Sequence, residues 1–200
     1  MSVADLPSRH ADRWARATRH PFLDAVRDGS IEDSAFDRWL AQDYLFVADL
    51  LRFQARLLGR APRSAQGVLA GGALALVDEL AWFEEQAAGR RLSLEARPLP
   101  ATAAYARLLD RLDSLDTTVA LAMLWTLERT YLEAWAYAAP GAPAYREYVE
   151  HWTTPEFAEY VDALAAATDA LGGAADLDPL FREVVEAEIS FWEMAWEAAA

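Results

Sequence analysis

Apolar residues recur at helical spacing along nearly the whole of this chain, and no segment shows the clean alternation of a half-buried strand. The clearest case runs from Ile31 to Leu58, where large apolar side chains fall along one side of a helix. These side chains are Phe36, Trp39, Leu40, Phe46, Val47, Leu50 and Phe53. The pattern predicts an all-α protein.

Turn-forming residues divide this pattern into about eight helical segments. The expected segments are Ser8 to Asp28 with a break near His20-Pro21, Ile31 to Leu58, Ser64 to about Ala88, Ala101 to Leu112, Thr118 to Ala138, Ala144 to Trp152, Thr154 to Gly172-Gly173, and Asp178 to Ala199. Ser114-Leu115-Asp116-Thr117 is a cap-like turn before the fifth segment, and Thr153-Thr154-Pro155-Glu156 opens the seventh with a threonine cap and a first-turn proline. Eight or so helices in 200 residues predict a single-domain helical bundle over residues 1–200.

Composition and charge exclude several classes of protein. A net charge of −14 argues against a nucleic-acid-binding surface, which needs a basic stripe. The chain has no Cys, so disulfides, thiolate metal sites and a thiol nucleophile are excluded. The longest uncharged apolar run, Gly67 to Val77, is too short to cross a bilayer, and the first 20 residues lack the apolar core of a signal peptide. A soluble cytoplasmic protein is expected.

Three acidic residues on three different helices lie in the middle of apolar stripes: Asp43, Glu128 and Glu188. Their neighbours three and four positions away are Trp39, Leu40, Phe46 and Val47 for Asp43, Leu124, Trp125, Tyr131 and Leu132 for Glu128, and Val184, Val185, Phe191 and Trp192 for Glu188. A buried carboxylate is costly without a partner. We therefore expect the three acids to share one polar cavity, where desolvation and mutual repulsion raise their pKa values and suit them to acid–base catalysis.

Each acid has an ordinary alternative, which is to reach the rim of the bundle or to pair with an arginine such as Arg129 or Arg182. The aromatic residues also allow two interpretations. Most of the Trp and Tyr side chains belong to the core, whereas a few line the pocket, since flat apolar walls suit a flat heteroaromatic ligand.

Metal and cofactor sites find little support in the sequence. The three histidines, His10, His20 and His151, form no Glu-x-x-His pair of a di-iron bundle and no axial haem position. His151 is interpreted as a surface or capping residue. No nucleophile elbow, P-loop or dinucleotide-binding glycine motif occurs. No metal and no cofactor are therefore expected.

The stretch "HPFLDAVRDGSIEDSAFDRWLAQDYLF" resembles the opening of the TenA (thiaminase II) family, which has the haem-oxygenase-like all-α fold. The end, "EAEISFWEMAW", is similar to the closing helix of that family, and "ELAWFEEQA", "TAAYARLL" and "YREYVEHWTTPEF" lie between them in the expected order. The resemblance covers essentially the whole chain.

The resemblance implies a set of site residues. Asp43 falls on the aspartate that holds the aminopyrimidine, Tyr105 on a pocket tyrosine and Glu188 on the catalytic glutamate of the last helix. Glu128 falls on the cysteine nucleophile, and "WTLERTY" looks like a branch of the family in which glutamate replaces that cysteine. Phe46 and Trp152 stand where relatives have tyrosines; the candidate substrate-binding residues are Asp43, Phe46, Trp82, Tyr105, Tyr131 and Trp152.

The function that the resemblance implies is hydrolysis of an aminopyrimidine in thiamin salvage. Glu128 would activate water, and Glu188 would protonate the departing amine or orient its partner. Two alternatives stay open: a non-catalytic or substrate-divergent small-molecule binder, and an oxidative relative resembling PqqC or the di-iron enzymes of this fold. Members of the family are commonly homodimers or homotetramers, so the same is expected here.

Overall fold

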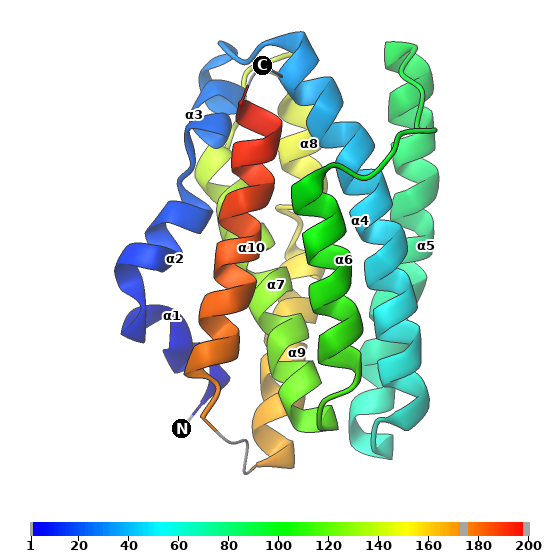
Figure 1. Cartoon of the computed structure of the whole chain (residues 1–200), viewed down its shortest axis with the longest axis vertical. Coiled ribbons are helices and arrows are strands. Elements are labelled where there is room, and N and C mark those ends of the chain that lie inside the picture. The colour runs from blue at the N-terminus through cyan, green and yellow to red at the C-terminus, as the bar shows by residue number, and fades with distance from the viewer. Residues whose placement is uncertain (1, 173–175, 198–200) are drawn as a thin grey trace.

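The computed structural model describes residues 2–172 and 176–197, and its helices run along the long axis of the molecule (Figure 1). The described helices are η1 (Val3–Asp5), α1 (Leu6–Arg9), α2 (Ala11–Thr18), α3 (Pro21–Asp28), α4 (Asp33–Arg60), α5 (Arg63–Arg90), α6 (Pro100–Asp113), α7 (Thr117–Ala138), α8 (Arg146–His151), α9 (Pro155–Leu171) and α10 (Asp178–Trp196). Within these ranges there is no strand, so the predicted all-α class is confirmed.

Local sequence signals explain where the helices begin and end. Gly29 adopts a left-handed conformation with φ 82° and ends α3, because residues with a Cβ adopt this conformation at a cost. Asp116 accepts a hydrogen bond from the Thr118 backbone N–H at 2.8 Å and begins α7, as predicted. Thr154 likewise caps α9 through the Phe157 N–H at 3.2 Å.

Three helix predictions differ in detail from the structure. The first expected segment is broken at His10 as well as at His20-Pro21, so it forms α1, α2 and α3. His20 caps α3 by accepting from the Phe22 N–H. The expected helix from Ala144 to Trp152 is only α8, because the chain first makes a turn up to Tyr145. Gly173 and Ala199 lie outside the described residues, and α10 ends at Trp196.

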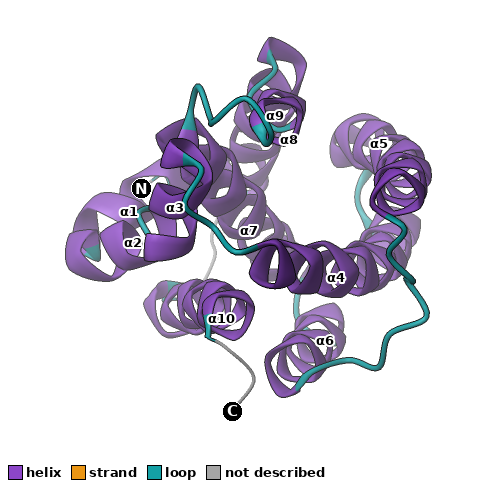
Figure 2. Cartoon of the chain, turned by 90° about the horizontal axis from the view of Figure 1, so that it is seen from above, coloured by secondary structure: helices purple, strands orange, loops and turns teal. Residues whose placement is uncertain are grey.

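Helices α4 and α7 form the centre of the bundle (Figure 2). Helix α4 packs against α5 on one side and α6 on another, while α7 packs against α9 and α10. Helices α1 to α3 lie together at one edge of this arrangement (Figures 1 and 2). Each of the two central helices therefore has neighbours on several sides, and a polar residue in the middle of either one is enclosed.

Aromatic side chains fill much of the space between α4, α7 and α10. Trp39 and Trp135 meet edge to face with ring centroids 5.1 Å apart, and Trp152 stacks on Trp135 at 4.9 Å. Trp39, Trp135 and Trp192 are all fully buried. Such aromatic packing makes a rigid floor for the functional site that adjoins it.

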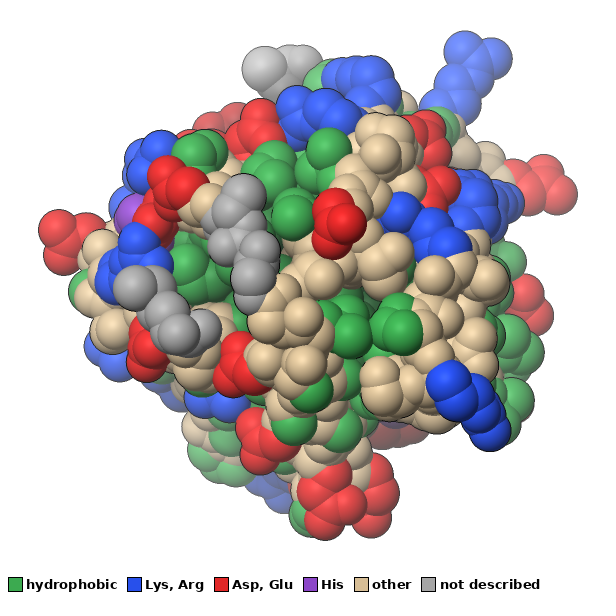
Figure 3. All heavy atoms as spheres, turned by 90° about the horizontal axis from the view of Figure 1, so that it is seen from below, with side chains coloured by type: hydrophobic (Ala, Val, Ile, Leu, Met, Phe, Trp, Pro, Cys, Tyr) green, Lys and Arg blue, Asp and Glu red, His purple; other side chains and the backbone are tan. Residues whose placement is uncertain are grey.

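The surface carries charged side chains of both signs (Figure 3). In the face seen from below, basic side chains are interspersed with acidic and hydrophobic ones and form no single continuous patch (Figure 3). No helix among the described residues is both long and apolar enough to cross a membrane.

Candidate active site

A cavity of about 510 Å³ lies between α4, α5, α7 and the α8–α9 segment. Its wall is mostly apolar, with a few polar groups that face inward. The lining residues are Phe46, Val47, Leu50, Val68, Gly71, Gly72, Ala75, Leu76, Asp78, Glu79, Leu127, Glu128, Tyr131, His151, Trp152, Thr154, Glu156, Phe157 and Tyr160. A cavity of this size and composition suits a small heteroaromatic molecule.

Glu128 lies in the wall of this cavity and is 6% exposed. Burial raises its pKa to about 8, with further contributions from the negative charges of Glu79 and Glu188. A hydrogen bond from Tyr160 acts in the opposite direction and stabilises the ionised form. The glutamate therefore changes its charge close to neutral pH, as an acid–base catalyst needs to do.

Glu79 of α5 is a second carboxyl group in the same wall. Its Oε1 accepts a hydrogen bond from Trp152 Nε1 at 2.8 Å, while burial raises its pKa to about 7. Glu79 was not among the predicted site residues, although it lies in an apolar stripe as the other acids do. Its neighbours three and four positions away are Ala75, Leu76, Trp82 and Phe83, an apolar set.

Asp43 of α4 is 1% exposed and lies directly behind Tyr131. The Tyr131 hydroxyl donates to Asp43 Oδ2 at 2.5 Å. Burial raises the pKa of Asp43 well above its ordinary value; the Tyr131 hydrogen bond opposes this rise, and the charges of Glu79 and Glu188 add to it. Because Tyr131 lines the cavity, the pair joins the wall to a buried acid.

Glu188 of α10 is paired in the same way with Tyr105 of α6. The Tyr105 hydroxyl donates to Glu188 Oε1 at 2.5 Å, and Glu188 is 3% exposed. Burial raises the pKa of Glu188 to about 7, although the Tyr105 hydrogen bond lowers it. The Tyr105 ring packs against Phe46 of the cavity wall, with centroids 4.6 Å apart.

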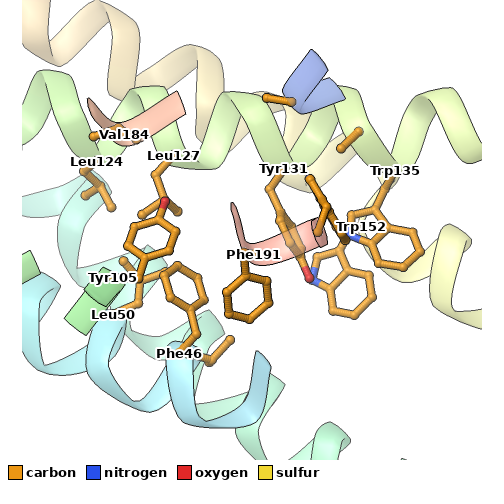
Figure 4. Close-up of a cluster of buried hydrophobic side chains, with 14 of the residues drawn as sticks. Phe46, Leu50, Tyr105, Leu124, Leu127, Tyr131, Trp135, Trp152, Val184 and Phe191 are labelled. Atoms are coloured by element: carbon orange, nitrogen blue, oxygen red, sulfur yellow. The ribbon is translucent and has the colours of Figure 1, made fainter. Parts of the chain in front are cut away.

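Asp43, Glu128 and Glu188 are all buried, and the charge of Glu188 raises the pKa values of the other two. Only Glu128 is part of the cavity wall, together with the predicted residues Phe46, Tyr131 and Trp152. Figure 4 shows Phe46 and Tyr105 on one side, Tyr131, Trp135 and Trp152 on the other, and Phe191 between them. Asp43 contacts the wall through the Tyr131 hydroxyl, whereas Glu188 bonds Tyr105, whose ring packs against Phe46 of the wall.

Trp82, another predicted substrate-binding residue, lies outside the wall and supports it. Its ring stacks on His151 with centroids 3.8 Å apart and meets Trp152 edge to face at 5.1 Å. The interpretation of His151 as a surface or capping residue is wrong, because His151 lines the cavity and burial lowers its pKa to about 4. Its imidazole is therefore neutral at physiological pH.

Arginine pairing does not account for the buried acids. Arg129 pairs with Glu133 of the same helix at 2.7 Å and lies 3.8 Å from the exposed Asp162 of α9. Over the described ranges 2–172 and 176–197, no three His, Asp or Glu side chains are arranged to hold a metal ion. The titratable groups in the cavity wall are carboxyl groups, the phenols of Tyr131 and Tyr160, and the imidazole of His151.

A helical bundle that encloses an aromatic cavity with titratable acids in its wall belongs to the class of small-molecule-binding α-helical enzymes. The family model described as the TENA/THI-4/PQQC family matches residues 8–198. The chain therefore belongs to this family, and its all-α architecture is the haem-oxygenase-like fold predicted from the sequence motifs.

Individual relatives agree with this assignment. A soybean (Glycine max) protein named probable bifunctional TENA-E protein is 33% identical over 94% of this chain and 90% of its own length. An aminopyrimidine aminohydrolase from Halalkalibacterium halodurans is 28% identical over 97% of this chain and 95% of its own length. The crystal structure of a TenA homologue from Pyrococcus furiosus superimposes with a TM-score of 0.92 at 28% identity, covering 98% of this chain and all of that one.

Proposed function

We propose that this protein hydrolyses a C–N bond of a 4-aminopyrimidine in thiamin salvage. The substrate is 4-amino-5-aminomethyl-2-methylpyrimidine or its N-formyl form. Water replaces the amino group to give the hydroxymethyl product and ammonia, or removes the formyl group to give the amine and formate. The observation that carries the proposal is the aromatic cavity with Glu79 and Glu128 in its wall, and the names of the soybean and bacterial relatives support it.

The aromatic part of the wall would hold the pyrimidine ring. Phe46, Tyr131 and Trp152 offer flat surfaces from α4, α7 and the end of α8. A 4-aminopyrimidine presents an N–H donor beside a ring-nitrogen acceptor, and a carboxyl group can match both. We assign this recognition to Asp43 acting together with Tyr131, whose hydroxyl it holds.

Glu128 would take a proton from water as the water oxygen bonds to carbon and the C–N bond breaks. The nitrogen of a cationic aminomethyl group leaves as ammonia, whereas that of the formylamino group receives the proton from Glu128 and leaves as the amine. In the empty cavity the pKa of about 8 keeps most Glu128 side chains protonated at neutral pH. A cationic aminomethyl group beside Glu79 and Glu128 would favour their ionised forms. The substrate itself would therefore produce the base that activates water.

Glu188 would act through Tyr105. Its carboxyl group is hydrogen-bonded to the Tyr105 hydroxyl, so it orients that ring against Phe46. We further propose that the chain is of the glutamate branch of the family, with Glu128 in place of the cysteine nucleophile. A carboxylate is a poorer nucleophile than a thiolate, so attack by water replaces attack by the protein.

The proposal is tested by assaying both pyrimidines with the wild-type protein and Glu128→Gln. Loss of the general base is expected to reduce kcat by about 10²–10⁴-fold. Glu95→Gln is the matched control, because Glu95 lies exposed in the segment before α6. Turnover that is unchanged in Glu128→Gln contradicts the assignment. Stabilisation against heat by the pyrimidines without product formation supports a non-catalytic binder instead.

A cytoplasmic location and self-association into a homodimer or homotetramer also belong to the proposal. Leu74 and Val77 support self-association, because these apolar side chains are 64% and 50% exposed and share one face of α5. Light scattering coupled to size-exclusion chromatography tests it. A monomeric mass at micromolar concentration rules it out.

A further inference from the structure

A chain of three hydrogen-bonding groups lies behind Glu128. The Tyr160 hydroxyl of α9 donates to Gln54 Oε1 of α4 at 3.2 Å, and Gln54 Nε2 donates to the Leu69 carbonyl oxygen of α5 at 3.0 Å. Tyr160 and Glu128 line the same cavity, and interaction with the Tyr160 hydroxyl lowers the pKa of Glu128. Three helices thus contribute to one polar path that ends at the cavity.

The Leu69 carbonyl group fixes the orientation of the Gln54 amide. A backbone carbonyl can only accept, so the NH₂ group of Gln54 faces Leu69 and its oxygen faces Tyr160. Gln54 is completely buried, and water does not reach its amide. The amide oxygen therefore depends on Tyr160 for its hydrogen bond, and losing that bond costs the desolvation energy of the oxygen.

The Tyr160 hydroxyl has one proton for two acceptors, Gln54 and Glu128. When Glu128 is protonated, it can donate to the Tyr160 oxygen while Tyr160 donates to Gln54, and every group has a partner. When Glu128 is ionised, its best donor is the same Tyr160 proton, and Gln54 Oε1 is then left without one. The ionised form of Glu128 competes with a buried amide for a single proton.

We propose that Gln54, acting through Tyr160, is a positioning residue that favours the protonated form of Glu128 and so sets the pH range in which Glu128 can activate water. The catalytic part of this statement rests on the proposed hydrolase function. The competition between Gln54 and Glu128 for the Tyr160 proton depends only on contacts within the protein.

Gly72 gives independent support, because its missing side chain makes room for the path. A Cβ at this position would lie 2.3 Å from Gln54 Nε2 and 2.4 Å from the Tyr160 hydroxyl oxygen. Both groups would have to move. Gly67, on the same helix, has no atom within 4 Å of the corresponding Cβ position.

Other groups also face Glu128 and must stay constant in a test of this path. They are Glu79 of α5, Glu188 of α10 and Tyr105 of α6. The carboxylates among them raise the pKa of Glu128, whereas the Tyr160 hydrogen bond lowers it. Substitutions at residues 54 and 160 alter the path and leave these side chains in place.

The experiment is a ¹³C NMR titration of ligand-free protein labelled at the glutamate carboxyl carbons, with the Glu128 signal assigned by its absence in Glu128→Gln. Gln54→Met releases the Tyr160 proton to the ionised carboxylate, so the pKa of Glu128 is expected to fall by about 0.5–1 unit, the equivalent of one hydrogen bond. Tyr160→Phe removes the donor altogether, so the pKa is expected to rise by a similar amount. Gln54→Met and Tyr160→Phe are thus expected to shift the pKa of Glu128 in opposite directions.

Gly72→Ala is the second route to the same result, with Gly67→Ala as its control for the added methyl group. Gly72→Ala is expected to move the Glu128 titration, and Gly67→Ala to leave it unchanged. Shifts in the same direction for Gln54→Met and Tyr160→Phe, or no shift in Gln54→Met, overturn the proposal.

Activity measurements then separate this inference from the proposed function. If the pyrimidines are substrates, the acidic limb of the kcat/KM profile moves with the NMR titration in each variant. If the wild-type protein hydrolyses neither pyrimidine, the hydrolase assignment fails while the NMR shifts still decide the role of Gln54.

Discussion

Tyr131 donates its hydroxyl proton to Asp43 across 2.5 Å, and this bond joins the two central helices at the cavity wall. Tyr105 and Glu188 repeat the arrangement between α6 and α10 at the same distance. Each buried acid thus has one phenol that stabilises its charge, and each phenol belongs to the aromatic layer around the cavity. Acid and ring are positioned together, so removing one disturbs the other.

Tyr131→Phe is expected to destabilise the fold by about 1–3 kcal/mol, because it leaves the Asp43 carboxyl group buried without that donor. Urea unfolding at neutral pH measures the change. Tyr44→Phe is the matched control, since the Tyr44 hydroxyl bonds Glu84 at an exposed site and its loss should cost less than about 0.5 kcal/mol. Equal losses in the two variants contradict a structural role for the Asp43 pair.

Glu128→Gln is expected to be more stable than the wild type at alkaline pH. The folded-state pKa of about 8 exceeds the ordinary value of 4.5, so the folded state binds the proton more tightly than the unfolded state. The stability that the protonated side chain contributes is complete below pH 4.5 and is lost as the pH rises toward 8. The glutamine side chain of Glu128→Gln does not titrate and loses no stability in this range. Its free energy of unfolding is therefore expected to exceed that of the wild type by on the order of 1–3 kcal/mol at pH 8 and by little at pH 5.

Urea unfolding of both proteins at pH 5 and pH 8 measures this difference. Glu95→Gln serves as the control and should follow the wild type at both pH values, because Glu95 is exposed. An advantage of Glu128→Gln that does not grow between the two pH values would show that burial of the carboxyl group is not what raises its pKa.

Glu79→Gln is expected to change both the rate and its pH dependence. The Glu79 charge raises the pKa of Glu128, so the amide should move the acidic limb of the kcat/KM profile to lower pH. Loss of a carboxylate that faces the substrate amine should reduce kcat/KM by about 10–100-fold. Glu84→Gln on the same helix controls for the change of charge, because Glu84 is exposed and bonds Tyr44. If kcat/KM decreases but the acidic limb of its pH profile stays at the same pH, Glu79 is not electrostatically coupled to Glu128.

Helical periodicity was sufficient to predict the architecture, because each long helix of this bundle has an apolar stripe and clear turn residues at its ends. Asp43, Glu128 and Glu188 were predicted to be buried on the same grounds, since a side chain at the centre of such a stripe faces the neighbouring helices. Glu79 satisfied the same criterion and was overlooked, so this omission lay in the search and not in the sequence.

The depth of each acid in the site, and the tyrosine that it bonds, could not be predicted from helical periodicity. Periodicity tells which side of a helix is buried but not how deep each side chain lies or which phenol it meets. Asp43 and Glu188 therefore looked equivalent to Glu128, although only Glu128 lines the cavity and the other two bond the hydroxyls of Tyr131 and Tyr105. His151 was misjudged for the same reason, because its contact with Trp82 depends on how α8 lies against α5.

The charges of the cavity wall predict that phosphorylated pyrimidines are excluded. Within the described residues the wall contains four carboxyl groups, those of Asp78, Glu79, Glu128 and Glu156, and no Lys or Arg, while burial keeps His151 neutral. A phosphate ester would bring like charge into a poorly solvated space without a cation to balance it. We expect 4-amino-5-hydroxymethyl-2-methylpyrimidine to bind at least about 100-fold more tightly than its phosphate ester, corresponding to about 2.7 kcal/mol. Calorimetric titration of both compounds at low and moderate salt measures this ratio, which should decrease as salt screens the repulsion; equal affinities would contradict an acidic binding site.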